Sequence, residues 1–194
     1  MSQSRLLSVL VENKPGVLMR VASMIRRRGF NIDALSVGPT EGGTVSRMTI
    51  SVHVGRQQAE QATKQLAKLI DVITIDDITG HRVVSHELLL IRLHAPSEQR
   101  RDVLDVVDIF RGRVVDVAAS SVIVEVTGSS EKIENFIELM RPFGVKEVAR
   151  SGAVALVRGD DARLRLVDFE PPNEDEDGGV RTSAAVADDT TGNV

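Results

Sequence analysis

The residues best suited to chemistry lie in the segment Asn13-Lys14-Pro15-Gly16-Val17-Leu18, which joins a predicted strand to a predicted helix. Gly16 has no Cβ, so a ligand can approach the backbone there closely. The N–H groups of Gly16, Val17 and Leu18 lie at the helix start, where the helix itself offers no acceptor and its dipole favours a carboxylate. Asn13 adds an amide that both donates and accepts hydrogen bonds. The segment therefore predicts a small anion-binding loop.

A second polar residue, Asn31, lies between the apolar residues Phe30 and Ile32 at the next predicted strand. Side chains alternate between the two faces of a strand, so Asn31 projects away from both neighbours. A free amino acid needs a carboxylate site, acceptors for its ammonium group and a small apolar pocket, and the loop and this strand could supply all three. The same residue types also serve ordinary turns and caps, and the pattern by itself leaves both interpretations open.

Motifs that support catalysis or metal binding are absent from the sequence. There is no P-loop, no Gly-x-Gly-x-x-Gly or Gly-x-Ser-x-Gly pattern, and no cysteine. Among the four histidines, only His81 and His86 lie close together, and their spacing does not fit a helical metal pair. Asp76 and Asp77 are adjacent, so on a strand they point to opposite faces. We expect no catalytic residue and no metal ligand; a metal-responsive protein that uses the histidines is an alternative.

The composition of the 194 residues is that of a soluble globular protein, with 42% hydrophobic and 27% charged residues. The absence of cysteine fits a reducing compartment, and we expect a cytoplasmic protein. Five phenylalanines are the only aromatic residues, which leaves few platforms for stacking nucleic-acid bases. No apolar run approaches the roughly 18 residues of a membrane span. We therefore expect no nucleic-acid partner and no membrane partner.

Charge is distributed unevenly along the chain. The net charge is −4, but residues 168–194 hold eight acids against one arginine, which gives −7 and leaves +3 for residues 1–167. The same segment contains Pro171-Pro172 and Gly178-Gly179 and has little to bury. Burial therefore cannot offset the entropy lost on ordering. We predict a disordered acidic C-terminal tail over residues 165–194.

The first half alternates between strand and helix periodicity. Helical spacing occurs between Pro15 and Gly29, which suit a helix start and a left-handed stop. A second helix is predicted over residues 57–70, with Ile70 on its buried side. Four strands surround these helices, at residues 5–11, 30–37, 45–54 and 72–78.

The second half repeats this order, with helices that follow Pro96 and Ser129. Its strands are predicted at residues 87–93, 113–117, 122–127 and 143–149, with a short extra strand at 153–157. The order β-α-β-β-α-β is the ferredoxin-like arrangement, an antiparallel sheet with both helices on one face. We predict an α+β protein with two ferredoxin-like βαββαβ domains, at residues 4–80 and 85–160.

The second face of each predicted sheet has no element of this chain that must cover it. Its apolar alternate positions would be exposed in a monomer, and exposed apolar surface of that kind usually marks an interface. The second half of the chain is one candidate for part of that cover, but a second copy about a two-fold axis is the commoner solution, and we therefore expect a homodimer.

The segment Leu7–Leu18 resembles the opening of an ACT domain. More narrowly, it resembles that of the regulatory, or small, subunit of acetohydroxyacid synthase, also called acetolactate synthase. The resemblance covers residues 4–160 and makes the second domain ACT-like. Five further segments match in order, namely Arg28–Ile32, Ser46–Ile50, Lys68–Val72, Ile109–Gly112 and Glu147–Gly152.

The resemblance implies a subunit with no catalysis of its own and no cofactor in this chain. It implies a catalytic large subunit that carries thiamine diphosphate, FAD and magnesium, whose activity the small subunit raises. It also implies feedback inhibition by valine, in some members also by leucine or isoleucine, bound between two ACT domains. The implied effector contacts are Asn13, Gly16, Val17, Leu18, Asn31 and Ile32. The chain departs from shorter family members in its acidic tail.

A stand-alone amino-acid-sensing ACT regulator is the alternative function. If it acted on transcription, it would need a helix-turn-helix or a basic face, and the sequence shows neither.

Overall fold

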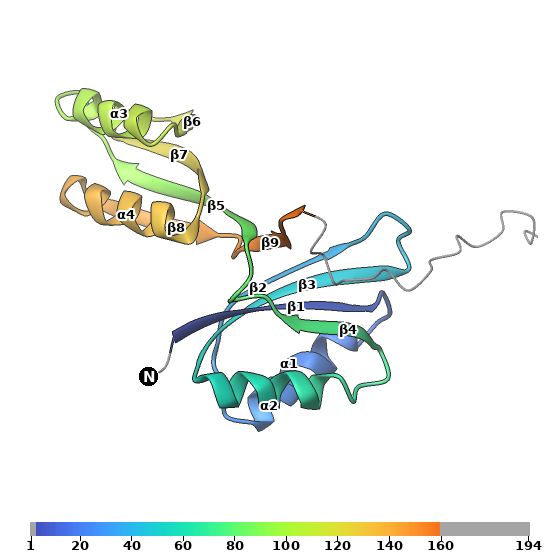
Figure 1. Ribbon diagram of the computed structural model, residues 1–194. Helices are drawn as coiled ribbons and strands as arrows, with labels where there is room; N and C mark the ends of the chain where they lie inside the picture. Colours follow the sequence, from blue (N-terminus) through green and yellow to red (C-terminus); the bar gives the residue numbers. More distant parts are fainter. Residues whose placement is uncertain (1–2, 160–194) are drawn as a thin grey trace, which may run out of the picture. The chain divides into compact units, whose positions relative to one another are not determined.

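The structure is a computed structural model, and it describes residues 3–159. The tail predicted at residues 165–194 lies outside the described residues. The first half contains β1 (Gln3–Glu12), α1 (Val17–Arg27), β2 (Ile32–Pro39), β3 (Val45–Val54), α2 (Arg56–Leu66) and β4 (Val72–Asp77). Its strands form an antiparallel sheet in the order β2-β3-β1-β4, with both helices on one face (Figure 1). This is the predicted ferredoxin-like arrangement.

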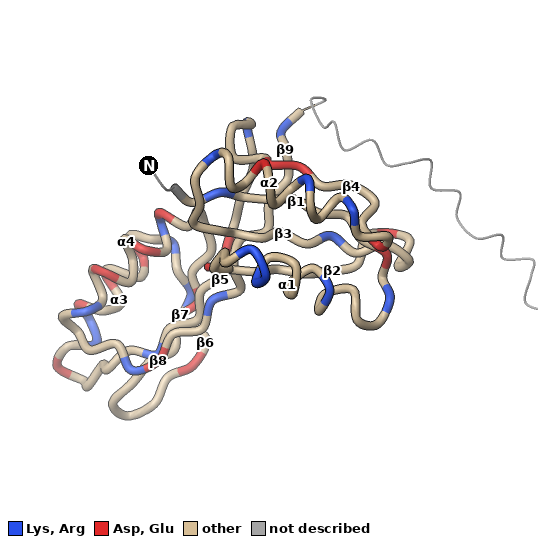
Figure 2. The backbone as a smooth tube through the Cα atoms, turned by 90° about the horizontal axis from the view of Figure 1, so that it is seen from below, with Lys and Arg blue, Asp and Glu red and all other residues tan. Residues whose placement is uncertain are grey.

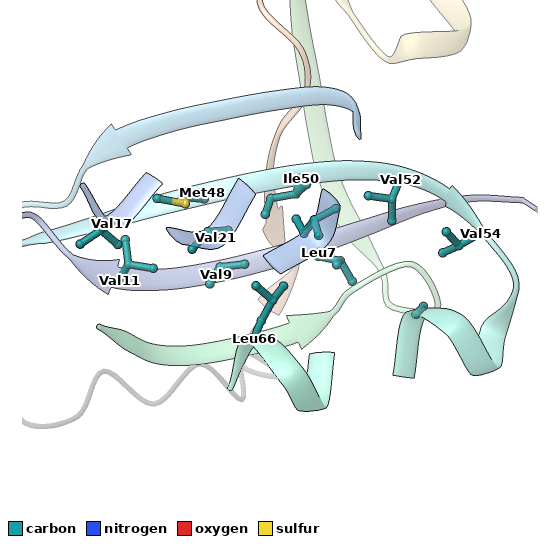
Figure 3. Close-up of a cluster of buried hydrophobic side chains, with 12 residues drawn as sticks. Leu7, Val9, Val11, Val17, Val21, Met48, Ile50, Val52, Val54 and Leu66 are labelled. Atoms are coloured by element: carbon teal, nitrogen blue, oxygen red, sulfur yellow. The ribbon is translucent and has the colours of Figure 1, made fainter. Parts of the chain in front are cut away.

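Strand alternation places the apolar core of this half between the sheet and the helices. Leu7, Val9 and Val11 of β1 point toward the helices, as Figure 3 shows. The alternate residues of β3 that lie beside them are Met48, Ile50, Val52 and Val54. The helices complete the core with Val17, Val21, Ile25, Ala59 and Leu66.

The opposite face of the first sheet is mainly polar at its centre. Ser8 and Thr49 face each other across β1 and β3, and both are buried. Arg47 donates from Nη1 to Ser8 Oγ at 3.1 Å. Leu10 is the buried apolar exception. The expectation of an apolar second face is therefore wrong for this sheet, because the outward positions of its central strands are largely serine, threonine and arginine.

The second half repeats the topology. It contains β5 (Val83–His94), α3 (Arg100–Ile109), β6 (Arg113–Val117), β7 (Ser121–Gly128), α4 (Ser130–Met140), a 3-10 turn (Arg141–Phe143), β8 (Val145–Arg150) and β9 (Val154–Val157). The sheet order is β6-β7-β5-β8, and the predicted extra strand, β9, pairs with the first residues of β5. Phe110 and Phe136 meet in its core with ring centroids 5.2 Å apart. Both predicted domains thus have the ferredoxin-like βαββαβ fold.

The second sheet does expose apolar residues on its outer face. Leu88 and Leu90 of β5 are more than one third exposed. Cross-strand ion pairs also lie on this sheet, between Arg92 and Glu147 and between Arg113 and Glu125. Acidic and basic residues are interspersed along the described chain (Figure 2). No helix within residues 3–159 is long and apolar enough to cross a membrane.

The second helix ends earlier than its periodicity predicts. α2 stops at Leu66, and the following N–H groups of Lys68 and Leu69 bond to carbonyls three residues back. This tighter winding rotates the chain relative to an α-helix. Leu69 still packs against the core, but Ile70 is 94% exposed. The prediction that Ile70 is buried is therefore wrong.

At the end of β4, Asp77 is held in its charged form. Burial by itself would raise the pKa of Asp77, but hydrogen bonds from Thr79 and the nearby Arg5 guanidinium outweigh it and lower that pKa below the ordinary 3.8. The charged carboxylate therefore stabilises the fold above the unfolded-state pKa, and this contribution is lost as the pH falls through the lower folded-state value.

We expect Asp77→Asn to lower the free energy of unfolding by about 1–2 kcal/mol at pH 7, since hydrogen bonds to a charged group are lost. Urea unfolding of both proteins from pH 7 down to pH 2 measures this difference. The difference should shrink toward the acid end. A difference that stays constant over the whole range would contradict the role given to the charge.

Candidate functional site

The loop between β1 and α1 is here called the α1 loop and comprises Asn13–Gly16. Gly16 is the N-cap of α1 and has φ of 85°, in the left-handed region. A residue with a Cβ is strained in this conformation by about 1 kcal/mol. A Cβ at Gly16 would nevertheless meet no atom of residues 3–159 within 4 Å. The loop therefore needs glycine for its backbone shape, and the space above that glycine is open.

The N-terminus of α1 offers backbone donors, as the sequence predicts. The first full helical bond runs from Arg20 N–H to the Gly16 carbonyl at 3.1 Å, and Val17 N–H reaches the Lys14 carbonyl only at 3.4 Å. The N–H groups of Gly16 and Leu18 find no acceptor within residues 3–159. These donors, together with the positive end of the helix dipole, suit a carboxylate.

Asn13 has a structural role that limits what it can offer a ligand. Its Nδ2 donates to the Gly43 carbonyl at 2.7 Å, and its N–H donates to the Thr44 carbonyl at 2.7 Å. Both bonds fix the α1 loop to the hairpin between β2 and β3. The Oδ1 atom has no such bond within the described residues and can accept from an ammonium group.

The three apolar candidates differ in what they present. Val17 is only 2% exposed and belongs to the core, so its side chain cannot line a surface pocket and only its backbone could contact a ligand. Leu18 is 44% exposed and is available for an apolar contact. Ile32 packs partly against the core.

Asn31 does not approach the α1 loop in one chain. It follows the C-terminal end of α1, whereas Gly16 precedes the N-terminal end. The 11 residues of α1, at about 1.5 Å per residue, separate these ends by roughly 16 Å. Asn31 Nδ2 bonds locally to Asp33 Oδ1 at 3.3 Å. The predicted residues therefore form two groups within one chain, which a single small ligand cannot bridge.

Two residues that the sequence interpretation missed hold the α1 loop on both sides. The Asp71 carbonyl accepts from Glu12 N–H at 2.9 Å, where the loop begins. The Asp71 carboxylate accepts from Arg20 Nη2 at 2.8 Å, just beyond the helix start, and Arg20 Nε lies 2.8 Å from its second oxygen. Asp71 is 6% exposed and stands alone among the apolar residues Leu69, Ile70, Val72 and Ile73. A single acidic residue in an otherwise apolar segment was the sequence signal from which this structural role could have been recognised.

No group of three or more histidine, aspartate or glutamate side chains within residues 3–159 is arranged to hold a metal ion. The arrangement that the structure does provide is one for binding a small anion. Its parts are N–H groups without an acceptor in the described part of the chain, an open approach at Gly16 and a firmly held loop.

We expect Asp71→Ala to lower the free energy of unfolding by about 1–3 kcal/mol, because a nearly buried carboxylate loses its hydrogen-bonded partner. The half-exposed Arg20 can return to solvent, which keeps the loss moderate. The control is Glu60→Ala, which breaks the exposed Arg56–Glu60 pair on α2 and should change stability by less than about 0.5 kcal/mol. Urea unfolding measures both, and equal effects would show that Asp71 does not hold the loop.

Comparison with known families and structures gives one consistent match. Residues 7–74 match the AHAS small subunit-like ACT domain, and residues 86–159 match the small subunit of acetolactate synthase. A probable acetolactate synthase small subunit of Archaeoglobus fulgidus is 54% identical over 154 residues, 79% of this chain and 96% of the relative. The acetolactate synthase small subunit of Mycolicibacterium smegmatis is 49% identical over 153 residues, 79% of this chain and 90% of the relative.

A crystal structure of the acetolactate synthase small subunit from Thermotoga maritima matches with a TM-score of 0.74 and 37% sequence identity. The match covers 81% of this chain and 99% of the Thermotoga chain. Two family models, close relatives and a solved structure thus agree with the fold. The chain belongs to the family of acetolactate synthase small subunits.

Proposed function

We propose that this chain is a non-catalytic regulatory subunit that raises the activity of a catalytic acetolactate synthase large subunit and confers feedback inhibition by valine or another branched-chain amino acid. The observation that carries the proposal is the set of partner-free N–H groups at the start of α1, in a chain of this family. A carboxylate is the group that every amino-acid effector would bring to them. We assign thiamine diphosphate, FAD and magnesium to the large subunit and no cofactor to this chain.

The separation of Asn31 from the α1 loop supports a homodimer as the functional form. β2 is an edge strand that begins just after Asn31 and ends at Pro39, beside the hairpin that Asn13 contacts. Two copies of β2 paired antiparallel about a two-fold axis would bring the start of one strand to the end of the other. This pairing places Asn31 of one protomer near the α1 loop of its partner, and the dimer gains two equivalent sites.

The proposed effector contacts follow from the groups that remain available. The N–H groups of Gly16 and Leu18 bind the carboxylate, and the backbone of Val17 lies between them. Asn13 Oδ1 and the Asn31 amide oxygen across the interface accept from the ammonium group. Leu18 and Ile32 across the interface contact the aliphatic side chain. Two aliphatic contacts of this kind suit a small branched side chain, and contact with both protomers makes the effector sensitive to their arrangement.

Regulation requires the effector to bind two arrangements of the complex with different affinity. Such couplings are typically about 1–3 kcal/mol, and they are reciprocal. The large subunit should therefore change valine affinity by the same factor by which valine changes the affinity for the large subunit. A stand-alone amino-acid sensor is not favoured, since both family models and the relatives are acetolactate synthase subunits.

We expect Gly16→Asp to raise the valine concentration needed for half inhibition at least tenfold while stimulation of the large subunit is largely kept. The new carboxylate would point into open space beside the proposed carboxylate site and repel the effector. Acetolactate formation from pyruvate, with purified large subunit and increasing valine, measures both properties.

The control is Gly159→Asp, because Gly159 also has positive φ, and no atom of the described residues lies within 4 Å of its Cβ position. It carries the same backbone strain but lies far along the chain from the α1 loop, so both stimulation and valine inhibition should persist. A Gly16→Asp protein that remains fully valine-sensitive would refute the site. An unmodified chain that neither binds nor stimulates the large subunit would refute the proposed function.

A further inference from the structure

Three consecutive arginines, Arg26–Arg28, end the first helix, and all three are exposed. We call them the arginine cluster. The helix dipole favours a cation in the last turn of a helix, but three adjacent positive charges also repel one another. An acidic group that binds the cluster removes this repulsion. The cluster is therefore a candidate binding surface for an anionic partner.

The arginine cluster lies at the end of the first sheet where β1 and β2 begin and where β3 and β4 end. Ile32, four residues after Arg28, pairs with Val52 of β3. Val52 in turn pairs with Arg5 near the start of β1, and β4 ends at Asp77 in the same part of the sheet. The strand pairing therefore specifies which charged residues share this end of the first domain.

Two acids at this end are paired with basic residues outside the cluster. Asp77 binds Arg5, with Oδ2 and Nη1 2.8 Å apart. Glu60, on the first turns of α2, binds Arg56 with Oε1 and Nε 3.2 Å apart. Each pair is neutral, so neither pair changes the balance of charge around the arginine cluster.

Among the described residues of the first domain, Asp76 and Asp33 are the other acids at this end. Asp76 lies opposite Ser8, on the sheet face away from the helices. Asp33 is exposed, and its carboxylate accepts a hydrogen bond from Asn31. None of the three arginines forms an ion pair within residues 3–159. Three positive charges thus stand against one nearby aspartate, and the cluster stays net positive.

The described part of the chain also ends near this end of the first domain. β9 pairs with the first residues of β5, and Arg158 N–H donates to the Arg82 carbonyl at 2.7 Å. Arg82 follows Asp77, the last residue of β4, by five positions, which limits their separation to about 18 Å. The residues after Arg158 therefore start close to the end of β4.

The acidic run Glu174–Asp177 is long enough along the chain to reach the arginine cluster. It lies outside the described residues, but its charge and its distance along the chain follow from the sequence. The 16 positions from Arg158 to Glu174 can span roughly 53 Å. The path through the linker, across four strands and on to Arg28 is at most about 46 Å. Reach is thus assured in whichever direction the chain continues.

Charge and tethering both favour this run over other anions. Four adjacent acids match three adjacent arginines, and guanidinium groups bind carboxylates through two parallel hydrogen bonds. Residues 168–194 as a whole carry −7, which adds longer-range attraction. A segment of the same chain is also present at an effective concentration on the order of mM. A free anion would need a comparable concentration to compete.

We propose that the acidic run Glu174–Asp177 docks on the arginine cluster of the same chain. The docked run shields the cluster, so another anion or an acidic protein surface reaches the arginines only by displacing it. The contact requires neither valine nor the large subunit, and the inference is independent of the proposed function.

The test uses the full chain with a spin label on Val180→Cys, which is a unique attachment point because the chain has no cysteine. The label broadens the amide NMR signals of residues that the acidic run contacts. At low salt we expect the signals of Arg26–Arg28 to lose at least half of their intensity. Those of Arg101 and Lys146, exposed bases of the second domain, should change little. High salt should restore the α1 signals, because exposed charges are screened.

A charge-reversed variant and a matched control separate the cluster from general electrostatics. Arg26→Glu with Arg27→Glu should abolish the broadening in the last turn of α1 at low salt. Arg101→Glu with Lys146→Glu changes the net charge equally and should leave that broadening intact.

A second variant neutralises the acidic run with Glu174→Gln, Asp175→Asn, Glu176→Gln and Asp177→Asn. It should abolish the broadening as well. Because it changes no residue of 3–159, it tests the contact even if the arginine variant fails to fold.

Four results would overturn the inference. The α1 signals of the unmodified chain could keep their intensity at low salt, or their broadening could survive neutralisation of the acidic run. Broadening that disappears when the labelled chain is diluted with excess unlabelled, isotope-free copies would show a contact between chains. Loss of affinity for the large subunit in the arginine variant, without broadening in the unmodified chain, would assign the cluster to that partner. None of these results depends on valine inhibition, so the proposed function is tested separately.

Discussion

The α1 loop depends on one nearly buried carboxylate. The Asp71 carboxylate accepts from Arg20 just after the loop, and the backbone carbonyl of Asp71 accepts from Glu12 N–H just before it, so the turn at Gly16 is held at both ends. The N–H groups of a helix start bind an anion well only when they are already aligned, since ordering them on binding would consume part of the affinity. The net contribution of this ion pair to stability is small, because burying a charge costs free energy. Its main effect is therefore on the shape of the α1 loop.

The length of α1 imposes the second constraint. A helix of 11 residues places Gly16 and Asn31 at opposite ends, although both belong to the same strand-helix-strand unit. If the two contact one small ligand, they must come from different protomers. The dimer interface and the ligand site then become one structure. The affinity of a ligand bound there would depend on the arrangement of the two subunits, and its binding would in turn shift that arrangement. This is the requirement for an allosteric effector.

Much of the fold could be predicted, because local periodicity and turn chemistry agree along the chain. Alternation in β1 and β3, helical spacing after Pro15 and the repeat of this order in the second half all specify the ferredoxin-like topology. The errors occurred where tertiary contacts outweigh periodicity. Ile70 continues the helical pattern but follows a tighter turn that leads into Asp71. The outer positions of the first sheet are largely polar, and those at its centre, such as Ser8 and Thr49, are buried, so the apolar outer face expected from strand alternation is not present there.

The sequence alone determined the fold class, the family resemblance and the residue types of the α1 loop, since these depend on spacing along the chain. Only the tertiary structure decided which of those residues are available. It placed the Val17 side chain in the core, tied the Asn13 amide to Gly43 and separated Asn31 from the loop by the length of a helix. It also revealed the role of Asp71, because hydrogen bonds there join residues that lie more than 50 positions apart, and such pairings leave no periodic signal in the chain.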